Sequence, residues 1–294
     1  MFDYFVFIIY KVIVSIFRFT PRFLIKYVLD GLAFFIFIVN KKHKKIADIN
    51  LDFAFHNTKS KEEKIHIIKE SYKSFIYNMY EFIDNQYAKK EDIFKKSDIV
   101  NEQYIIEAIK ENKLIIFVTA HYGAWEQCLP AISLKYGTTN IVNRRMNNKY
   151  INEEYIKARD KNNIVMIEKK SAAKGMIKAL KKKEHLAVVI DQNTAYGVDI
   201  KFFSQKARAT DSTSRLAVKF DALIIPILCV MNEFGSYTII CKKPIDHKKL
   251  KEENKIQVLT QMQADVFEEQ IQKLPEQWFW QHKRWKYHYP DMYK

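Results

Sequence analysis

Residues 113–131, KLIIFVTAHYGAWEQCLPA, decide the fold of this chain. The apolar and β-branched residues 114–119 predict a buried strand. The strand ends before His121, and Gly123 permits the tight turn of a strand-to-helix corner. A helix can begin at Ala124, although Pro130 would weaken or kink it. His121 is therefore predicted at the carboxyl edge of a sheet, where open α/β sheets bind their ligands.

The same segment contains a His-x4-Glu spacing, because Glu126 follows His121 by five positions. On one regular helix these positions would lie about 140° apart. A turn before the helix allows the carboxylate to return to the imidazole, fix its tautomer and raise its basicity. This is the arrangement of a general base, although a histidine after a strand, taken alone, is more often structural.

Strands and helices alternate on both sides of this segment. A capping box at Ser60 and Glu63 predicts a helix over residues 60–84, and a shorter helix is predicted near 105–109. Further strands are predicted at 141–143, 164–167, 186–190, 223–230 and 237–241, and further helices at 149–161, 171–183, 212–220 and 255–272. This alternation predicts an α/β fold with a central mixed β-sheet flanked by helices.

Composition narrows the classes of partner. The 294 residues carry a formal charge of +15, which indicates anionic partners unless the lysines only keep an apolar protein soluble. With 6 glycines and neither G-x-G-x-x-G nor G-x4-G-K-[ST], a glycine-rich nucleotide loop is excluded. Cys128, Cys229 and Cys241 stand singly in apolar surroundings without metal-ligand spacing, which is typical of reduced core cysteines in a cytosolic protein.

The N-terminal residues are strongly apolar. Residues 4–17 and 23–39 each contain charged side chains, and neither reaches the roughly 20 apolar residues of a spanning helix. The first residues also lack the positive charge of a cleaved signal peptide. Four lysines follow at positions 41, 42, 44 and 45, where they would meet anionic headgroups. We expect residues 1–45 to be a membrane-anchoring segment and 46–294 the catalytic domain; the alternative is an amphipathic helix docked on the protein's own core.

Polar side chains follow several predicted strands. Arg144 comes after the strand at 141–143, Arg159 lies one helix later, and Asp191 and Gln192 follow the strand at 186–190. Thr210 precedes the helix at 212–220. Each could instead serve as a helix cap or a surface ion pair. Because sheet-edge loops converge, we expect Arg159 and Asp191 within one side-chain length of His121.

Aromatic and basic residues alternate near the C-terminus, in WFWQHKRWKYHYP at 278–290. This stretch includes Trp280, His282 and Arg284. Its composition suits a membrane interface, and nucleic-acid stacking gives a similar one. We expect this block on the same side of the molecule as residues 1–40.

Five segments occur in one order: HYGAWE, NRRMNN with Arg159, KGMIKALKKKEHLAVVIDQN, GVDIKFFSQKARAT with SRLA, and LPEQWFWQHKRWK. Together, over about residues 50–290, they resemble the late acyltransferases of lipid A biosynthesis, the lauroyl/myristoyl transferase family of Gram-negative bacteria. The resemblance implies a glycerolipid-acyltransferase-like α/β sheet with flanking helices and N-terminal membrane-anchoring helices. Ser204 and Lys149 stand where glycine and proline are common in the family, which bears on the substrate rather than on the chemistry.

The resemblance implies transfer of a fatty acyl group from acyl carrier protein to a hydroxyl of a 3-hydroxyacyl chain on a lipid A precursor. His121 would be the general base and Glu126 would orient it, without an acyl-enzyme. Main-chain amides of the corner or a nearby arginine would stabilise the oxyanion. The residues expected to bind substrate are Arg144, Arg159, Asp191, Gln192, Thr210, Trp280, His282 and Arg284.

Further expectations concern partners and place in the cell. The acceptor is anionic, and the protein would lie at the cytoplasmic face of the inner membrane. No metal, cofactor or nucleic acid is implied. Two other functions remain open: a glycerolipid or lysophospholipid acyltransferase, and a non-enzymatic basic module that binds membranes.

Overall fold

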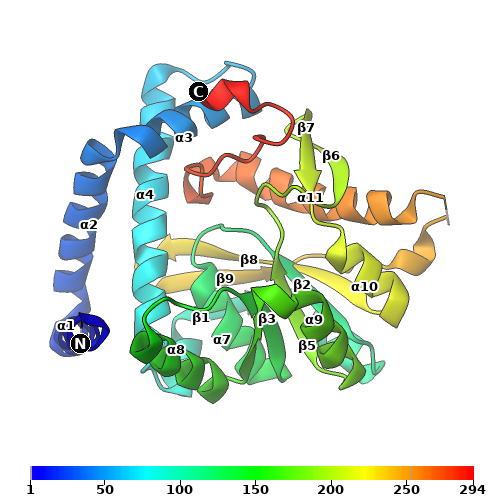
Figure 1. Cartoon of the computed structure of the whole chain (residues 1–294), viewed down its shortest axis with the longest axis horizontal. Coiled ribbons are helices and arrows are strands. Elements are labelled where there is room, and N and C mark those ends of the chain that lie inside the picture. The colour runs from blue at the N-terminus through cyan, green and yellow to red at the C-terminus, as the bar shows by residue number, and fades with distance from the viewer. Residues whose placement is uncertain (1, 252) are drawn as a thin grey trace.

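A seven-stranded sheet forms the centre of the molecule (Figure 1). The computed structural model describes residues 2–251 and 253–294. The strand order is β1-β9-β8-β2-β5-β3-β4; β8 and β9 pair antiparallel, and every other neighbouring pair is parallel. Its strands are β1 (Ser97–Val100), β2 (Ile115–Thr119), β3 (Thr139–Asn143), β4 (Ile164–Glu168), β5 (His185–Val189), β8 (Leu223–Glu233) and β9 (Ser236–Cys241). The predicted mixed α/β sheet is confirmed.

A small antiparallel hairpin, β6 (Val198–Phe202) with β7 (Gln205–Ala209), stands apart from this sheet. The helices are α1 (Phe2–Phe19), α2 (Arg22–Val39), α3 (Lys41–Ala54), α4 (Lys61–Asp84), α5 (Lys90–Lys95), α6 (Gln103–Lys110), α7 (Trp125–Tyr136), α8 (Lys149–Lys161), α9 (Ala172–Lys181), α10 (Ser212–Phe220) and α11 (Lys255–Lys273). The chain ends in an irregular segment that returns beside α3 and α11 (Figure 1).

Most sequence-predicted elements are present within a few residues. The capping box that starts α4 is confirmed, because Ser60 accepts from the Glu63 N–H at 3.2 Å and the Glu63 carboxylate accepts from the Ser60 N–H at 2.7 Å. The elements that the pattern missed are β1, β6, β7, α3 and α5. The strands among them are short and carry charged residues, so they lack the apolar run or clean alternation that marks a strand.

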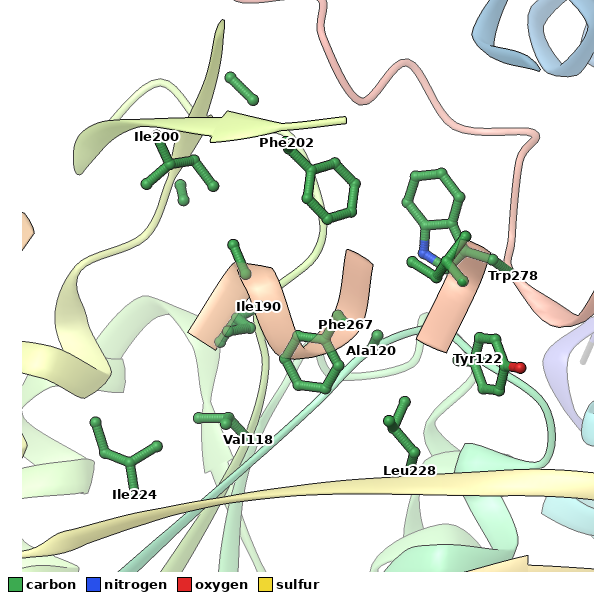
Figure 2. Close-up of a cluster of buried hydrophobic side chains, with 14 of the residues drawn as sticks. Val118, Ala120, Tyr122, Ile190, Ile200, Phe202, Ile224, Leu228, Phe267 and Trp278 are labelled. Atoms are coloured by element: carbon green, nitrogen blue, oxygen red, sulfur yellow. The ribbon is translucent and has the colours of Figure 1, made fainter. Parts of the chain in front are cut away.

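The core lies on both faces of β2, whose five residues are all buried. Ile116 and Val118 pack with α9, α10 and α11 on one face, and Ile115 and Phe117 pack with α6 and α7 on the other. Figure 2 shows how the first face continues past the end of β2 to Trp278. The sheet is therefore held rigidly where its central strand ends.

The aromatic C-terminal block is part of this core. Trp278, Trp280 and Trp285 are each 0% exposed and pack around Phe202 and Phe203 of the β6–β7 hairpin. The predicted membrane-interface role of these indoles is therefore wrong. A sequence in which aromatic and cationic residues alternate suits a protein core between a hairpin and a helix as well as it suits a membrane interface.

The lysines at positions 41, 42, 44 and 45 belong to the first turns of α3, which the sequence analysis did not predict. The opposite side of α3 is buried: Ala47 and Leu51 are 0% exposed. Asn50 is also buried, donates to the carbonyls of Trp280 and His282 at 2.7 Å each, and accepts from the Tyr293 hydroxyl at 2.5 Å. The predicted division at residue 45 thus falls inside a helix that is joined to the C-terminal segment.

The first two helices combine a packed face with an apolar exposed face. Ile25, Leu29 and Ala33 of α2 pack against α4. Many other side chains of α1 and α2 are large, apolar and exposed, including Phe5 (62%) and Phe35 (60%). In the described residues no single helix has the length and hydropathy to cross a bilayer; α2 and α3 satisfy that criterion only as a pair, bent by 84°.

The buried amide of Asn50 gives a test of this arrangement. Asn50→Ala should lower the free energy of unfolding by about 1–3 kcal/mol, because the carbonyls of Trp280 and His282 lose their donor inside the protein. Urea unfolding followed by tryptophan fluorescence measures this change. Asn147→Ala, on an exposed loop, is the control and should change stability by less than about 0.5 kcal/mol. Equal stability of both variants would contradict the role given to Asn50.

Candidate active site

The corner after β2 places His121 at the carboxyl edge of the sheet, as the sequence predicts. Gly123 makes this corner possible: its φ is +55°, and an added Cβ would lie 2.0 Å from the carbonyl oxygen of Cys229. The positive φ and the close approach of β8 both require glycine at this position. The corner is therefore fixed against the neighbouring strand.

Most backbone N–H groups of the corner are already bonded within the protein. Tyr122 donates to Ala120 at 2.8 Å, Gly123 to Gln277 at 2.9 Å, and Ala124 to Cys229 at 3.0 Å. The N–H groups of 121 and 126 donate to side chains. These amides stabilise the corner, and the expectation that main-chain amides of the corner or a nearby arginine would stabilise an oxyanion stays a prediction.

Asp191 is the residue that orients His121. Its carboxylate is 1% exposed and accepts three bonds: from the His121 N–H at 2.9 Å, from His121 Nδ1 at 2.8 Å, and from Trp278 Nε1 at 2.8 Å. Because a carboxylate only accepts, Nδ1 carries the proton and Nε2 keeps its lone pair. The predicted proximity of Asp191 to His121 is confirmed, and Trp278 is a supporting residue that sequence reasoning assigned to the membrane interface instead.

The charges of this pair stabilise each other. Burial alone would lower the pKa of His121, but the charge and hydrogen bond of Asp191, with a smaller effect of Glu126, raise it above its usual 6.5. Burial would raise the pKa of Asp191, yet His121 and the other donors hold it well below its usual range. Asp191 is thus an anion at neutral pH, and His121 is a stronger base than a free imidazole.

Glu126 does not take the role predicted for it. Its carboxylate forms an ion pair with Arg159 of α8, while the imidazole donates its hydrogen bond to Asp191. α7 begins at Trp125, so Glu126 already lies in the first turn of the helix, where its carboxylate meets Arg159. The predicted Glu126 contact with the imidazole is therefore corrected, although Glu126 stays close enough to affect the His121 pKa.

Arg159 is buried beneath Glu126. The whole residue is 6% exposed, and its guanidinium carbon lies 4.9 Å from the centroid of the Tyr155 ring. Burial acts to lower the pKa of Arg159, but the Glu126 carboxylate raises it above its usual value. The predicted proximity of Arg159 to the site is supported through Glu126, whereas the guanidinium is occupied by that carboxylate rather than open to an acceptor anion.

Gln192 lies at the reactive side of the imidazole. Its exposed side chain places Nε2 at 3.4 Å from His121 Nε2. Arg284 holds the backbone of Gln192. It is 1% exposed, and its guanidinium donates to the carbonyls of Arg208 at 2.7 Å and Gln192 at 3.4 Å. Burial lowers the pKa of Arg284 to about 10, so it remains a cation at neutral pH. The predicted contact of Arg284 with substrate stays a prediction; in this structure the guanidinium donates to the protein's own backbone.

The other C-terminal candidates are also turned inward. Trp280 is fully buried and donates from Nε1 to the Pro275 carbonyl at 2.7 Å, and its predicted substrate contact stays a prediction. His282 donates from Nδ1 to the Phe279 carbonyl at 2.9 Å, and burial lowers its pKa to about 4. Thr210 shares a hydrogen bond of 3.0 Å with Ser212 at the start of α10. The hydrogen bonds of these three residues are therefore made within the protein.

Arg144 is exposed and lines an open groove of 520 Å³. Glu126 and Arg145 line the same groove, which also includes Met79 and Phe82. The groove therefore places Glu126 next to two arginine side chains and two apolar side chains.

None of the three cysteines is suited to nucleophilic catalysis. Cys128, Cys229 and Cys241 are at most 1% exposed. Burial raises the pKa of the Cys241 thiol to about 12, and raises the pKa values of the other two as well. The chemistry that this site supports is proton transfer by His121 Nε2 to or from a bound group.

The comparisons with known proteins agree with this chemistry. A search of curated proteins found no match to the chain. A family model described as bacterial lipid A biosynthesis acyltransferase matches residues 1–287, which is nearly the whole chain. The chain therefore belongs to the bacterial lipid A biosynthesis acyltransferase family.

Proposed function

We propose that this acyltransferase moves a fatty acyl group from the thioester of acyl carrier protein to a hydroxyl of a 3-hydroxyacyl chain on a lipid A precursor. The observation that carries the proposal is the His121–Asp191 pair at the carboxyl edge of the sheet, in a chain of this family. The family favours a lipid A acceptor over a glycerolipid, and it favours an enzyme over a membrane-binding module.

The reaction needs a base because a secondary alcohol is a weak nucleophile at neutral pH. The acceptor hydroxyl oxygen attacks the thioester carbonyl while its proton passes to His121 Nε2. Asp191 stabilises the imidazolium that forms. The tetrahedral intermediate then breaks its C–S bond, the imidazolium returns the proton to the departing thiolate, and the ester and a free thiol are released. No acyl-enzyme is required.

The remaining polar groups divide between the oxyanion and the acceptor. We assign the oxyanion to the Gln192 amide, since it is a side-chain donor beside His121 Nε2 and most corner amides are bonded within the protein. Arg144, exposed in the groove beside Glu126, would pair with acceptor phosphates. The Glu126 carboxylate, held by Arg159, adds a second negative charge near the imidazolium.

A basic surface would bring in the acidic carrier. Lys169 and Lys170 follow β4 and are exposed, and the end of β4 pairs with the end of β3, directly before Arg144. The overall charge of +15 would accelerate the encounter with an acidic protein.

The purified protein, an acyl carrier protein thioester and a lipid A precursor test the proposal together. The expected product is an acceptor heavier by one acyl group, with one free thiol formed for each ester. Replacing the precursor with a lysophospholipid should give no product. Acylation of the lysophospholipid alone would overturn the assignment of the acceptor.

His121 and Asp191 should control the pH dependence. His121→Ala should lower kcat by at least about 10²-fold, because positioned proton transfer contributes that much. In the wild type, kcat/KM should fall as the pH drops through the His121 pKa, above 6.5, since imidazolium cannot accept a proton. Asp191→Asn removes the negative charge, lowers that pKa, and should move the acidic limb to lower pH while kcat falls.

These roles are tested by pH–rate profiles of the wild type, His121→Ala and Asp191→Asn, with melting temperatures as a control for folding. An acidic limb that stays in place in Asp191→Asn would remove Asp191 from its orienting role. His121→Ala activity within about tenfold of wild type would exclude the general base.

The oxyanion assignment gives a separate prediction. Gln192→Met keeps the length of the side chain but has no donor, and it should lower kcat by about 10²-fold with little change in KM. Gln192→Asn is the matched control, since it keeps an amide on a shorter side chain and should retain more activity. Equal kcat for Gln192→Met and wild type would show that another group binds the oxyanion.

We also propose that α1 and α2 hold the protein at the cytoplasmic face of the inner membrane. Their exposed apolar side chains would enter the acyl region, and the lysines at the start of α3 would meet anionic headgroups. Both substrates have acyl chains, so a site near the bilayer would shorten their path.

Vesicle sedimentation tests this attachment. Phe23→Asp combined with Phe35→Asp should weaken binding to anionic vesicles at least about tenfold, because a buried Phe side chain contributes about 1.5–3 kcal/mol. Ile109→Asp replaces an exposed apolar residue of α6 and should have no effect. Unchanged vesicle binding of the double variant would contradict the proposed anchor.

A further inference from the structure

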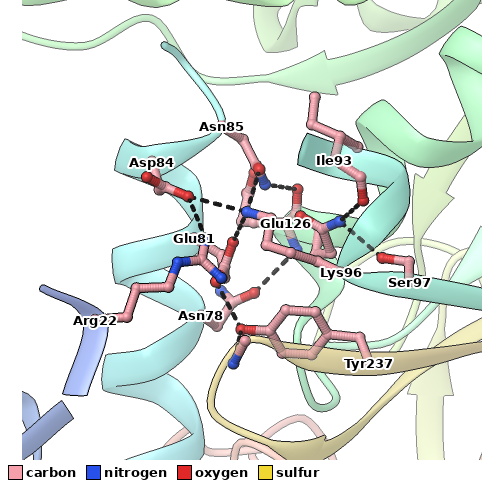
Figure 3. Close-up of polar contacts among 12 residues, drawn as sticks. Arg22, Asn78, Glu81, Asp84, Asn85, Ile93, Lys96, Ser97, Glu126 and Tyr237 are labelled. Carbon is pink, nitrogen blue, oxygen red and sulfur yellow. Dashed lines mark hydrogen bonds and ion pairs between the residues drawn. The ribbon is translucent and has the colours of Figure 1, made fainter. Parts of the chain in front are cut away.

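One face of α4 is directed at the start of α7, the helix that carries Glu126. Asn78, Glu81 and Asn85 follow one another at helical spacing on this face, and they are 0%, 0% and 5% exposed. Figure 3 shows the two asparagines on either side of Glu126. Neither asparagine has a place in the proton transfer described above.

Asn78 bonds the backbone N–H of Glu126. The first N–H groups of a helix have no partner within the helix, and Ala124 at the N-cap has no side chain that could accept from them. Asn78 Oδ1 accepts from the Glu126 N–H at 2.9 Å. A residue of another helix thus supplies the cap that the local sequence lacks.

Asn85 bonds the backbone carbonyl of the same residue. In a regular helix the Glu126 carbonyl would accept from the N–H of residue 130, but that residue is Pro130 and has no N–H. Asn85 Nδ2 donates to this carbonyl at 3.4 Å. The two asparagines therefore supply hydrogen-bond partners for the N–H and the carbonyl of Glu126, which lack these partners within α7.

Lys96 fixes the orientation of the Asn85 amide. Its side chain is 4% exposed, and Nζ donates to Asn85 Oδ1 at 3.0 Å and to Asp84 at 3.0 Å, beside Glu81. An ammonium group only donates, so the amide oxygen must face Lys96 and the NH2 group must face Glu126. Figure 3 shows this buried cluster, which extends to Arg22 of α2 through Asp84.

We infer that Asn78 and Asn85 form a two-point bracket that positions Glu126, so that its carboxylate pairs with Arg159 beside His121. The inference rests on the proposed function, in which that carboxylate stabilises the imidazolium. Asn78 and Asn85 are positioning residues, since they act through Glu126 and contact no reacting atom.

Pro130 makes the inference testable, because its substitution restores the missing donor. Asn85→Ala should lower kcat about tenfold or more with little change in KM, as a displaced catalytic-site group does. Pro130→Ala alone should keep kcat, since residue 130 can then donate to the Glu126 carbonyl. In the double variant Asn85→Ala/Pro130→Ala, kcat should return to within about threefold of wild type, although Lys96 still lacks its Asn85 partner.

Asn78→Ala and Ser74→Ala form a matched pair on α4. Ser74 is buried one turn earlier, and its hydroxyl has no partner in the part of the chain that the structure describes. Asn78→Ala should lower kcat, whereas Ser74→Ala should leave it unchanged. If Asn78→Ala does not fold, the Asn85/Pro130 set still decides the question.

A readout without substrate separates this inference from the proposed function. An NMR titration of His121 in the folded protein should show a lower pKa in Asn85→Ala and a return in the double variant, because the Glu126 charge contributes to that pKa. If this pattern appears but no acyl transfer occurs, the bracket stands and the proposed function fails. Two results would refute the bracket when acyl transfer does occur. One is a kcat of Asn85→Ala equal to that of wild type, and the other is a lowered kcat that Pro130→Ala does not restore in the double variant.

Discussion

The site depends on one buried anion, the Asp191 carboxylate, and on the three donors that surround it. A carboxylate out of contact with water is costly unless charged or polar groups compensate it. Here one donor is a backbone N–H, one is the imidazole that the carboxylate orients, and one is the Trp278 indole. The position of the His121 imidazole, its tautomer and the packing of the C-terminal segment therefore follow from the same group.

Much of the site could be predicted because strand ends can be read from sequence. The apolar runs before His121 and Asp191 predicted two strands whose ends meet at one edge of the sheet, and in the structure these strands are neighbours. Gly123 predicted the corner. The fold class followed from the same alternation, and α8 and α10 have the predicted bounds.

The failures share a physical cause: a composition that fits two environments. Glu126 was paired with His121 by spacing alone, whereas the true partner of His121 is 70 residues away and Glu126 faces a cation on α8. The Trp, Lys and Arg residues near the C-terminus suit an interface or a core equally well, and only their packing around the β6–β7 hairpin decides. The roles of Asn78 and Asn85 depend on how two distant helices meet, which no local pattern reveals.

The origin of the Trp278 indole has a consequence for how the enzyme matures. The donor that completes the surroundings of Asp191 comes from a segment that the ribosome makes after every strand of the sheet. The same segment supplies Gln277, which accepts from the Gly123 N–H at 2.9 Å, so the His121 corner and Asp191 each lack one partner until this segment is made and folds over the hairpin. The His121–Asp191 pair therefore gains its third donor only after every strand of the sheet has been made.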